Sequence, residues 1–494
     1  MTKTALLIDI TSIQKYVFLS NKLKENLGAS FLISDLYNSM VSKNDAVKDI
    51  PLKINGEYDG YMGGGNALLF FNSKVDAEEF VIEWTKSLLV LAPGVTVATA
   101  INEWNEGEDK FTNSRDALFD KLRENKSRFI SQTIIPRHGI SAECKSDGYS
   151  MDVWSNSEGD YISASTNAKI CAFPASKKKT DEDFNEPLGT NFYFTDLLED
   201  LGQSKGSENH IAIVHIDGNS MGDRFKKLNS LEATKQLSKD VEKAVKESFK
   251  ILLKAIVFEL QDEKKKGYLS IKKEGELPIR PIIMGGDDIT FACDGRMGIY
   301  YAKIFMEAFQ NQEDNNGNNL KLSSCAGIAV IKTKYPFYKG YQLAEELCAN
   351  AKSKRREMGN NGSWLDFHIA YGGFSGSLKE IRDIHYNAAL GSLIYRPYKI
   401  LDSSENSFET FISNAKELSK KWPNNKLKEL REVLTLGNDA AKIFVSEMEA
   451  RGLELPDIDT KGYNKILFKN RLTLYFDMLE LLEYYPKYEL EDAN

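Results

Sequence analysis

The sequence has few cysteines, no long apolar run and no excess of positive charge. Its five cysteines contain no Cys-x-x-Cys pair, which argues against disulfides and against a closed zinc site. No apolar run approaches the about 20 residues of a membrane-spanning helix, and Met1–Thr4 leads into an expected strand without a signal-peptide pattern. These absences predict a cytoplasmic protein. The net charge of −8 argues against a broad nucleic-acid platform.

One hairpin-like segment carries more charge than a turn requires. Two apolar runs, Ile282–Met284 and Ile289–Phe291, flank the turn Gly285–Asp288, which reads Gly-Gly-Asp-Asp. The runs predict two strands, and a hairpin needs no adjacent carboxylates at its turn. Glycines let a bulky ligand approach the backbone, and paired acids can hold Mg²⁺. Gly-Asp is also a common hairpin turn, so the tetrapeptide by itself fits both interpretations.

A third carboxylate stands at the end of an earlier apolar run. Ile211–Ile216 predicts a buried strand, and Asp217 follows it directly. Open α/β sheets place their chemistry at the carboxyl ends of such strands. Asp217, Asp287 and Asp288 therefore form a candidate catalytic cluster for two divalent ions. His215, in the middle of the strand, is expected to be a packed residue.

The elements around this cluster fit one compact unit. The patterns predict a strand, a long helix, the hairpin, a helix, a strand, a helix and a last strand, at about residues 211–216, 231–259, 282–291, 299–309, 322–331, 341–356 and 365–369. This order predicts a ferredoxin-like palm, an α+β fold that polymerases and nucleotide cyclases use. Lys352 lies in the last helix and is a candidate phosphate ligand, the alternative being a solvated helix lysine.

The N-terminal residues repeat the same pattern. A strand at 5–10 contains Asp9, helices are expected at 21–39 and 76–89, and a strand at 95–101 completes the unit. The segment Gly60–Phe71 aligns with the second hairpin, but Gly65-Asn66 replaces Asp287-Asp288. This first palm has lost two of its three candidate ligands, so the chemistry belongs to the second copy.

The glycines of the first copy have two interpretations. Gly63, Gly64 and Gly65 could lie against a nucleotide that accepts the transferred group, or they could only make a tight turn. If the first palm holds the acceptor, a bulky replacement at Gly64 should abolish the transfer and leave nucleotide binding at the second palm intact.

The length of 494 residues predicts three or four domains. We expect a degenerate first palm (1–110), an irregular linker domain without zinc cysteines (111–205), a catalytic second palm (206–372) and a helical C-terminal domain (373–494). Within the linker domain, the polar stretch Lys177–Glu186 is expected to be a surface loop. Apolar residues at helical spacing predict helices at about 408–422, 425–434, 439–451 and 463–485 in the last domain.

Several of these segments resemble the CRISPR polymerase family, the large palm-domain subunit of type III CRISPR effectors. The resemblance lies in Leu7–Phe18 for the first palm, and in Asp217–Gly222, Gly285–Asp288, Lys332–Pro336 and Ala351-Lys352 for the second. It covers both palms and most of the chain. More distantly, the motifs are similar to GGDEF-type diguanylate cyclases.

The resemblance implies that ATP is polymerised and cyclised into a cyclic oligoadenylate messenger of antiviral defence, with Mg²⁺ or Mn²⁺. Its implied partners are CRISPR effector subunits with guide RNA and target RNA, or further copies of the chain. It makes Asp217, Asp287 and Asp288 both catalytic residues and metal ligands. The implied nucleotide-binding residues of the second palm are Gly218, Asn219, Ser220, Gly222, Gly285, Gly286 and Lys352.

Three departures from the family pattern change what is expected. Asn219 stands where many relatives have a second acid, and the sequence contains no His-Asp dipeptide, so no HD nuclease activity is expected. The zinc-binding cysteine pairs common between the palms are absent, and Cys144 and Cys171 are expected to be buried thiols. The chain is short enough for a standalone relative that is not part of a large complex.

Two other functions fit the same residues. An enzyme that makes cyclic dinucleotides or mixed-base rings would carry the same three acids. A scaffold subunit of an RNA-guided complex would bind nucleotide without catalysis. The intact Asp287-Asp288 pair favours an enzyme, because the equivalent pair of the first palm has been lost.

Overall fold

The protein is described here by a computed structural model. The described residues are 3–36, 61–63, 65–105, 108–128, 141–201, 209–269, 271, 273–372, 376–388, 391–402, 407–456 and 466–490. They belong to two compact units, one within residues 1–185, 220–246 and 282–287, the other within 186–219, 247–281 and 288–494. Among the described helices, none combines the length and the apolar character that a bilayer crossing requires.

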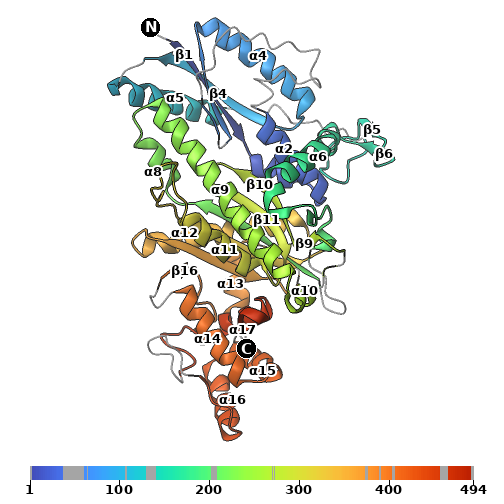
Figure 1. Cartoon of the computed structure of the whole chain (residues 1–494), viewed down its shortest axis with the longest axis vertical. Helices are drawn as coiled ribbons and strands as arrows, with labels where there is room; N and C mark the ends of the chain where they lie inside the picture. Colours follow the sequence, from blue (N-terminus) through green and yellow to red (C-terminus); the bar gives the residue numbers. More distant parts are fainter. Residues whose placement is uncertain are drawn as a thin grey trace. The chain divides into compact units, whose positions relative to one another are not determined.

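The first palm domain is a four-stranded antiparallel sheet in the order β2-β3-β1-β4 (Figure 1). Its elements are β1 (Lys3–Thr11), α1 (Ile13–Phe18), α2 (Leu23–Asp35), β2 (Tyr61–Gly63), β3 (Asn66–Phe71), α4 (Lys74–Leu91), β4 (Thr96–Trp104) and α5 (Glu108–Arg128). The succession is that of a ferredoxin-like fold.

Helices cover both faces of this first sheet, because its strands are apolar on both sides. One face packs on α5 in a single core cluster, formed by Ala5, Leu7, Leu68, Phe70, Ala98, Ala100, Trp104, Phe111, Leu118 and Leu122. On the other face, Phe71 of β3 contacts Phe80 of α4, with ring centroids 5.4 Å apart. Alternate residues of one strand therefore serve two cores.

The segment between the palms contains more helix than the sequence suggested. It comprises β5 (Val153–Ser155), β6 (Asp160–Ile162), α6 (Ala164–Asp183), α7 (Asn185–Leu188) and β7 (Tyr193–Phe194). The expected surface loop at Lys177–Glu186 was wrong: it is the end of α6 and the start of α7. The buried Ser176 donates a hydrogen bond to Leu27 O of α2 at 3.1 Å, so α6 packs against α2. Lys178 is exposed, whereas the ammonium of Lys179 lies over the Phe31 ring of α2. The polarity of the lysines therefore did not mark the absence of a helix.

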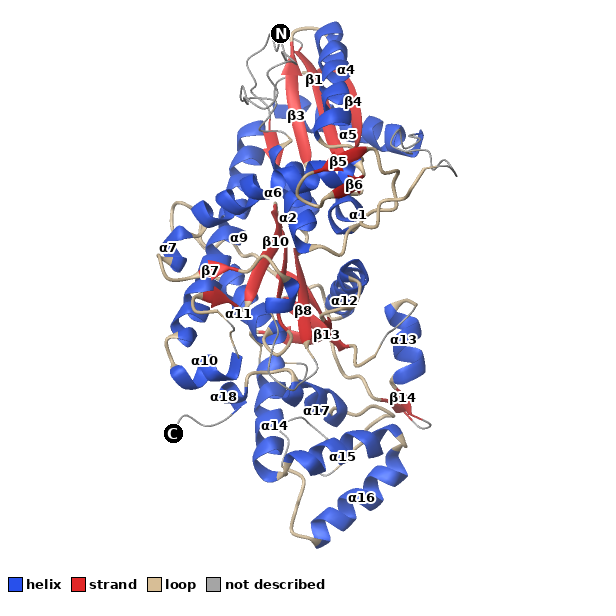
Figure 2. Ribbon diagram, turned by 90° about the vertical axis from the view of Figure 1, so that its right-hand side faces the viewer, coloured by secondary structure: helices blue, strands red, loops and turns tan. Residues whose placement is uncertain are grey.

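The second palm domain extends the same plan to six strands, in the order β10-β11-β8-β12-β13-β16, of which Figure 2 labels β10, β8 and β13. Its elements are β8 (His210–Gly218), α8 (Met221–Lys226), α9 (Leu231–Leu260), α10 (Glu263–Leu269), β9 (Glu276–Leu277), β10 (Ile279–Gly285), β11 (Asp288–Asp294), α11 (Gly298–Gln310), β12 (Ser324–Lys332), α12 (Phe337–Glu357), β13 (Ser363–Ile369), α13 (Leu378–His385), β14 (Asn387–Ala388), β15 (Gly391–Ser392) and β16 (Tyr398–Ile400). The first four strands correspond to those of the first palm. β13 adds to β12 in parallel, and β16 adds to β13 antiparallel.

Helix α12 lies directly on the sheet at Gly327 of β12. A Cβ atom at this position would lie only 1.9 Å from Ala344 O of α12, so no larger residue fits without moving the helix. This close approach matters for the site, because the carboxyl-terminal half of α12 carries Cys348 and Lys352.

The C-terminal domain is helical, with α14 (Phe408–Lys421), α15 (Asn424–Thr435), α16 (Asn438–Ala450), α17 (Tyr475–Glu483) and α18 (Lys487–Leu490). The first three helices match their predicted positions. The fourth was expected over 463–485; residues 463–465 lie outside the described residues, and α17 begins only at Tyr475. Before it, Asn470 and Arg471 have positive φ, which ends helical geometry there.

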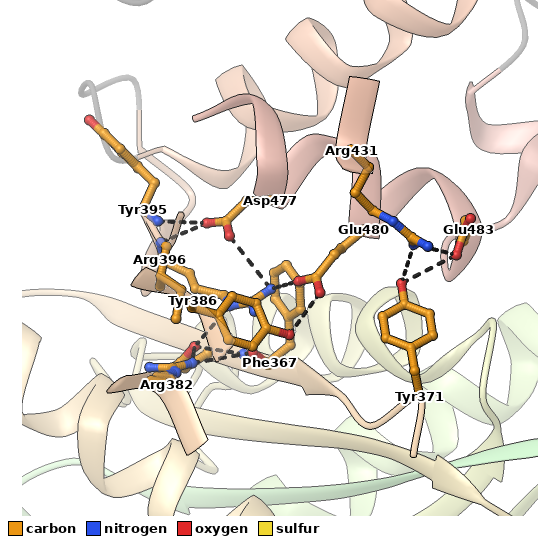
Figure 3. A network of polar contacts seen from close by, with 12 residues as sticks. Phe367, Tyr371, Arg382, Tyr386, Tyr395, Arg396, Arg431, Asp477, Glu480 and Glu483 are labelled. Atoms are coloured by element: carbon orange, nitrogen blue, oxygen red, sulfur yellow. Dashed lines mark hydrogen bonds and ion pairs between the residues drawn. The ribbon is translucent and has the colours of Figure 1, made fainter. Parts of the chain in front are cut away.

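Buried charges attach this helical domain to the second palm (Figure 3). Arg396, fully buried, contacts Glu480 of α17 at 2.6 Å and Asp477 at 3.6 Å. Arg382 of α13 makes two hydrogen bonds, of 2.7 and 2.9 Å, with the buried Asp366 of β13. The predicted α+β fold, with two ferredoxin-like palms and a helical C-terminal domain, is confirmed.

Candidate active site

Three carboxylates meet where the end of β8 lies beside the hairpin turn between β10 and β11. Asp217 is opposite Asp288 in the antiparallel register, so both side chains emerge on the same face of the sheet. Asp287 precedes Asp288 in the turn. One carboxylate oxygen from each of the three residues lies within 4.8 Å of the others. The structure therefore brings together the three acids that the sequence singled out.

The turn itself leaves room beside the acids. Gly286 has a φ of 61°, a left-handed conformation that favours glycine. A Cβ atom at Gly285 or at Gly222 would meet nothing within 4 Å. Both glycines thus border open space, as residues that lie against a nucleotide must.

Lys352 of α12 contacts the cluster directly. Its ammonium donates a hydrogen bond to Oδ2 of Asp217, and both side chains are about one quarter exposed, at 24% and 28%. Burial by itself would lower the pKa of Lys352, but the Asp217 carboxylate outweighs it and the pKa is raised. Lys352, the predicted phosphate ligand, therefore carries its positive charge in direct contact with Asp217.

Asn219 and Ser220 do not join the three acids. The Asn219 side chain is buried, and its amide donates to Ser323 Oγ at 3.2 Å and to Gly362 O at 3.4 Å. Ser220 takes a φ of 59° before α8, and Gly218 ends β8. Asn219 thus holds the strand end against its neighbours, while its predicted role in nucleotide binding stays a prediction.

A polar layer lies below the acids, on the face of the sheet that packs on α12. His215 Nδ1 is 3.1 Å from Thr290 Oγ1, and the thiol of Cys348 donates to Cys325 O at 3.2 Å. Burial lowers the pKa of His215 to about 4, so the ring is neutral at pH 7. Burial also raises the pKa of the Cys348 thiol well above its usual value. Sequence reasoning expected His215 to be packed but did not identify Cys348.

The first palm retains part of the same arrangement. Asp9 is opposite Asn66 in the register of β1 and β3, which confirms the alignment of Gly65-Asn66 with Asp287-Asp288. Lys126 of α5 forms an ion pair with Asp9, as Lys352 does with Asp217. Sequence reasoning missed Lys126, although its place near the end of the helix after the fourth strand could have indicated it.

The three glycines predicted in the first palm are only partly described. Gly63 ends β2, and Gly65 has a φ of 81° in the turn. Gly64 lies outside the described residues. Whether these glycines contact a nucleotide stays a prediction. The two cysteines of the segment between the palms differ: Cys144 is buried as expected, but Cys171 is exposed, which corrects the expectation of a second buried thiol.

The donor set of the second palm fits hard divalent ions. Carboxylate oxygens are the ligands that Mg²⁺ and Mn²⁺ prefer, and one or two carboxylates together with substrate phosphates are the usual Mg²⁺ site. The partial exposure of Asp217 leaves access for a nucleotide with its ions. Asp217, Asp287 and Asp288 are thus suited to hold them.

Comparisons with known proteins agree with this geometry. Residues 210–359 match the family model described as Cas10/Cmr2, second palm domain. The search of curated proteins found no match. The matched segment contains the three acids and Lys352.

Solved structures share the fold of nearly the whole chain. The crystal structure of Csm1 in T. onnurineus is 15% identical with a TM-score of 0.56, over 99% of this chain and 69% of that one. A Csm1–Csm4 cassette in complex with one ATP is 15% identical with a TM-score of 0.53, over 98% and 70%. The same kind of cassette in complex with pppApA is 16% identical with a TM-score of 0.52, over 98% and 69%. The resemblance seen in the sequence is thereby confirmed: residues 210–359 match a Cas10/Cmr2 second palm domain, and nearly the whole chain shares the fold of Csm1.

Proposed function

We propose that the second palm domain is a nucleotidyltransferase that joins ATP molecules and closes them into cyclic oligoadenylates, in CRISPR-type antiviral defence. The observation that carries the proposal is the register of Asp217 opposite Asp288, with Asp287 beside them, in a Cas10/Cmr2 second palm. Structures similar in fold were solved with ATP and with pppApA, the substrate and an intermediate of such a reaction.

Each residue of the site has a role in this proposal. Asp217, Asp287 and Asp288 would hold two Mg²⁺ or Mn²⁺ ions, which activate the acceptor hydroxyl and neutralise phosphate charge when bound. Gly285 and Gly286 leave the nucleotide room against the backbone. Lys352 brings a positive charge to the cluster, where the leaving pyrophosphate gains negative charge.

The transfer step balances without a protein base. The acceptor ribose oxygen forms a bond to the α-phosphorus of the donor, and the bond from that phosphorus to the oxygen leading to the β-phosphate breaks. Pyrophosphate leaves with the bonding electrons, and the hydroxyl proton passes to water. His215 is not required, because it is buried and its Nδ1 is held by Thr290.

We further propose that the chain works with CRISPR effector subunits. Two of the similar structures are cassettes of Csm1 with Csm4, so a partner of the Csm4 type is the first candidate. Guide RNA and target RNA would then act on this chain through such a complex.

The test is mass spectrometry of the products formed from each nucleoside triphosphate, singly and mixed, with Mg²⁺ or Mn²⁺. Wild-type protein should give cyclic oligoadenylates from ATP, and the Asp287→Ala/Asp288→Ala variant should give none. Cyclic products with other bases would overturn the choice of ATP. If the variant is as active as wild type, the site assignment is wrong. If wild type makes nothing even with effector subunits and target RNA, the chain is a scaffold.

A further inference from the structure

The polar layer below the acids has no counterpart in the described core cluster of the first palm. His215, Thr290 and Cys348 lie under the catalytic face, and each is nearly or fully buried. His215 and Thr290 are opposite each other in the register of β8 and β11. Ligand atoms of His215, Asp217 and Cys348 lie within 4.8 Å of one another. An imidazole, a thiol and a carboxylate are thus gathered at one point.

The first palm shows what the fold itself needs at these positions. His215 lies two residues before Asp217, as Leu7 lies two residues before Asp9. Their strand partners, Thr290 and Leu68, correspond in the same way. Cys348 lies one helical turn before Lys352, as Leu122 lies one helical turn before Lys126, so these two residues also correspond.

All three leucines are buried together in the same core cluster. In the first palm, leucine at all three positions is therefore sufficient for the sheet to pack against α5. Burying a polar group costs free energy unless a partner compensates for it. His215 and Cys348 have such partners in Thr290 Oγ1 and Cys325 O, so the leucines of the first palm show only that the fold itself does not require polar residues here.

The chemistry of the layer points to a soft metal ion. Imidazole nitrogen, thiolate sulfur and carboxylate oxygen are the ligands of Zn²⁺, and three protein ligands leave a fourth position open. Mg²⁺ does not choose sulfur or nitrogen, so the layer differs in kind from the all-carboxylate cluster above it. Thr290 Oγ1 also fixes the imidazole ring through Nδ1, the type of outer contact that orients metal-binding histidines.

We propose that His215, Asp217 and Cys348 form a site for a thiophilic divalent cation such as Zn²⁺, and that its occupation inhibits the second palm. Binding displaces the thiol proton of Cys348 to solvent and the Lys352 ammonium from Asp217. Inhibition follows because Asp217 is shared with the carboxylate cluster, and this second part rests on the proposed nucleotidyltransferase function.

Binding is tested first, with Co²⁺ as a spectroscopic probe in the absence of nucleotide. Wild-type protein should show a thiolate-to-cobalt charge-transfer band that saturates at one equivalent and is removed by Zn²⁺. The band should disappear in Cys348→Leu and in His215→Leu/Cys348→Leu, which carry the residues of the first palm. Cys171→Ser, at an exposed cysteine, should keep it.

The outcome of this titration decides whether the site exists. A band that persists in Cys348→Leu, or that is missing from wild type, overturns the proposal. Circular dichroism and thermal unfolding establish that the leucine variants fold, and Cys348→Ser, which keeps the size of the side chain, gives a second measurement if one of them does not.

Inhibition is tested by adding Zn²⁺ at constant Mg²⁺, with each variant compared with its own zinc-free rate. Half-inhibition of Cys348→Leu should need at least about tenfold more Zn²⁺ than that of wild type. If wild type binds zinc but both proteins are half-inhibited at the same Zn²⁺ concentration, the inhibitory role is wrong and the binding site stands. If wild type forms no product with Mg²⁺ even with effector subunits and target RNA, the proposed function fails, and the cobalt spectrum still decides the site.

Discussion

The two palm domains have the same strand order in their first four strands and an equivalent acid–lysine ion pair. They differ in the charged side chains around that ion pair. In each, the acid at the end of the first strand contacts a lysine of the helix after the fourth strand: Asp9 with Lys126, and Asp217 with Lys352. Both strands continue into a six-residue helix after a serine in the left-handed conformation. The backbone scaffold of the site and its acid–lysine pair are therefore present in both palms.

The difference between the palms is one of charge balance. Asp9 and Lys126 neutralise each other, and Asn66 adds no charge. In the second palm, three carboxylates lie together, and Lys352 contacts one of them, Asp217. Grouped carboxylates are the ligands that hard divalent cations prefer. The first palm therefore keeps the shape of the fold without the two hairpin acids, so the shape does not require Asp287 and Asp288.

The largest effect is expected from removing the strand acid of the second palm, with the strand acid of the first palm as the control. Asp217→Asn should lower the rate of product formation by about 100-fold or more, because losing a ligand removes several kcal/mol of charge stabilisation. Asp9→Asn should retain most of the activity, because its acid is already neutralised by Lys126. Product formation is followed by chromatography. Equal losses in the two variants would show that the first palm takes part in catalysis.

A smaller effect is expected for the paired lysines. Lys352→Met should reduce activity by about tenfold, because one charge-assisted contact near the leaving pyrophosphate is lost. Lys126→Met should leave kcat and KM close to those of wild type. Initial rates over a range of ATP concentrations measure both. An unchanged rate in Lys352→Met would mean that this lysine only neutralises Asp217.

Nucleotide affinity should depend on the open space at the hairpin. Gly285→Ala adds a methyl group that meets no protein atom within 4 Å, so the melting temperature should not change. ATP binding should weaken by up to about tenfold, because the methyl group enters the space proposed for the nucleotide. Gly372→Ala, also in open space but outside the site, is the matched control. Similar ATP affinities in the two variants, measured by calorimetry, would place the nucleotide elsewhere.

The smallest expected effect is a change in the pH dependence of stability. It concerns His368 of β13, a strand of the second palm that has no counterpart among the described strands of the first. Burial, with Arg396 and Arg382 nearby, holds the pKa of His368 well below its ordinary 6.5. Below that pH the unfolded chain binds a proton that the folded chain excludes, so the free energy of unfolding falls as the pH falls. His368→Phe should show a smaller fall between about pH 7.5 and about pH 5.5 in urea titrations. Parallel curves would mean that His368 is protonated in the folded protein.

Much of the second palm could be predicted from sequence because its signals are local. An apolar run that ends in Asp217 and a hairpin with Asp287-Asp288 indicate strands and acids without knowledge of the neighbours. The predicted helices 408–422, 425–434 and 439–451 also match α14, α15 and α16, because each has its own apolar stripe. The errors arose where polarity was taken for coil, at Lys177–Glu186, or where a turn interrupts a helical pattern, before Tyr475.

The sequence by itself determined that the chain repeats one strand-and-helix unit, that only the second copy keeps three acids, and which family it resembles. Only the tertiary structure decided that Asp9 has a lysine partner, that Asn219 turns inward, and that Cys348 lies beside His215 and Asp217. The physical reason is distance along the chain. Asp217 and Cys348 are far apart in sequence. They meet because β8 pairs antiparallel with β12, and because α12, which carries Cys348, packs on β12 at Gly327.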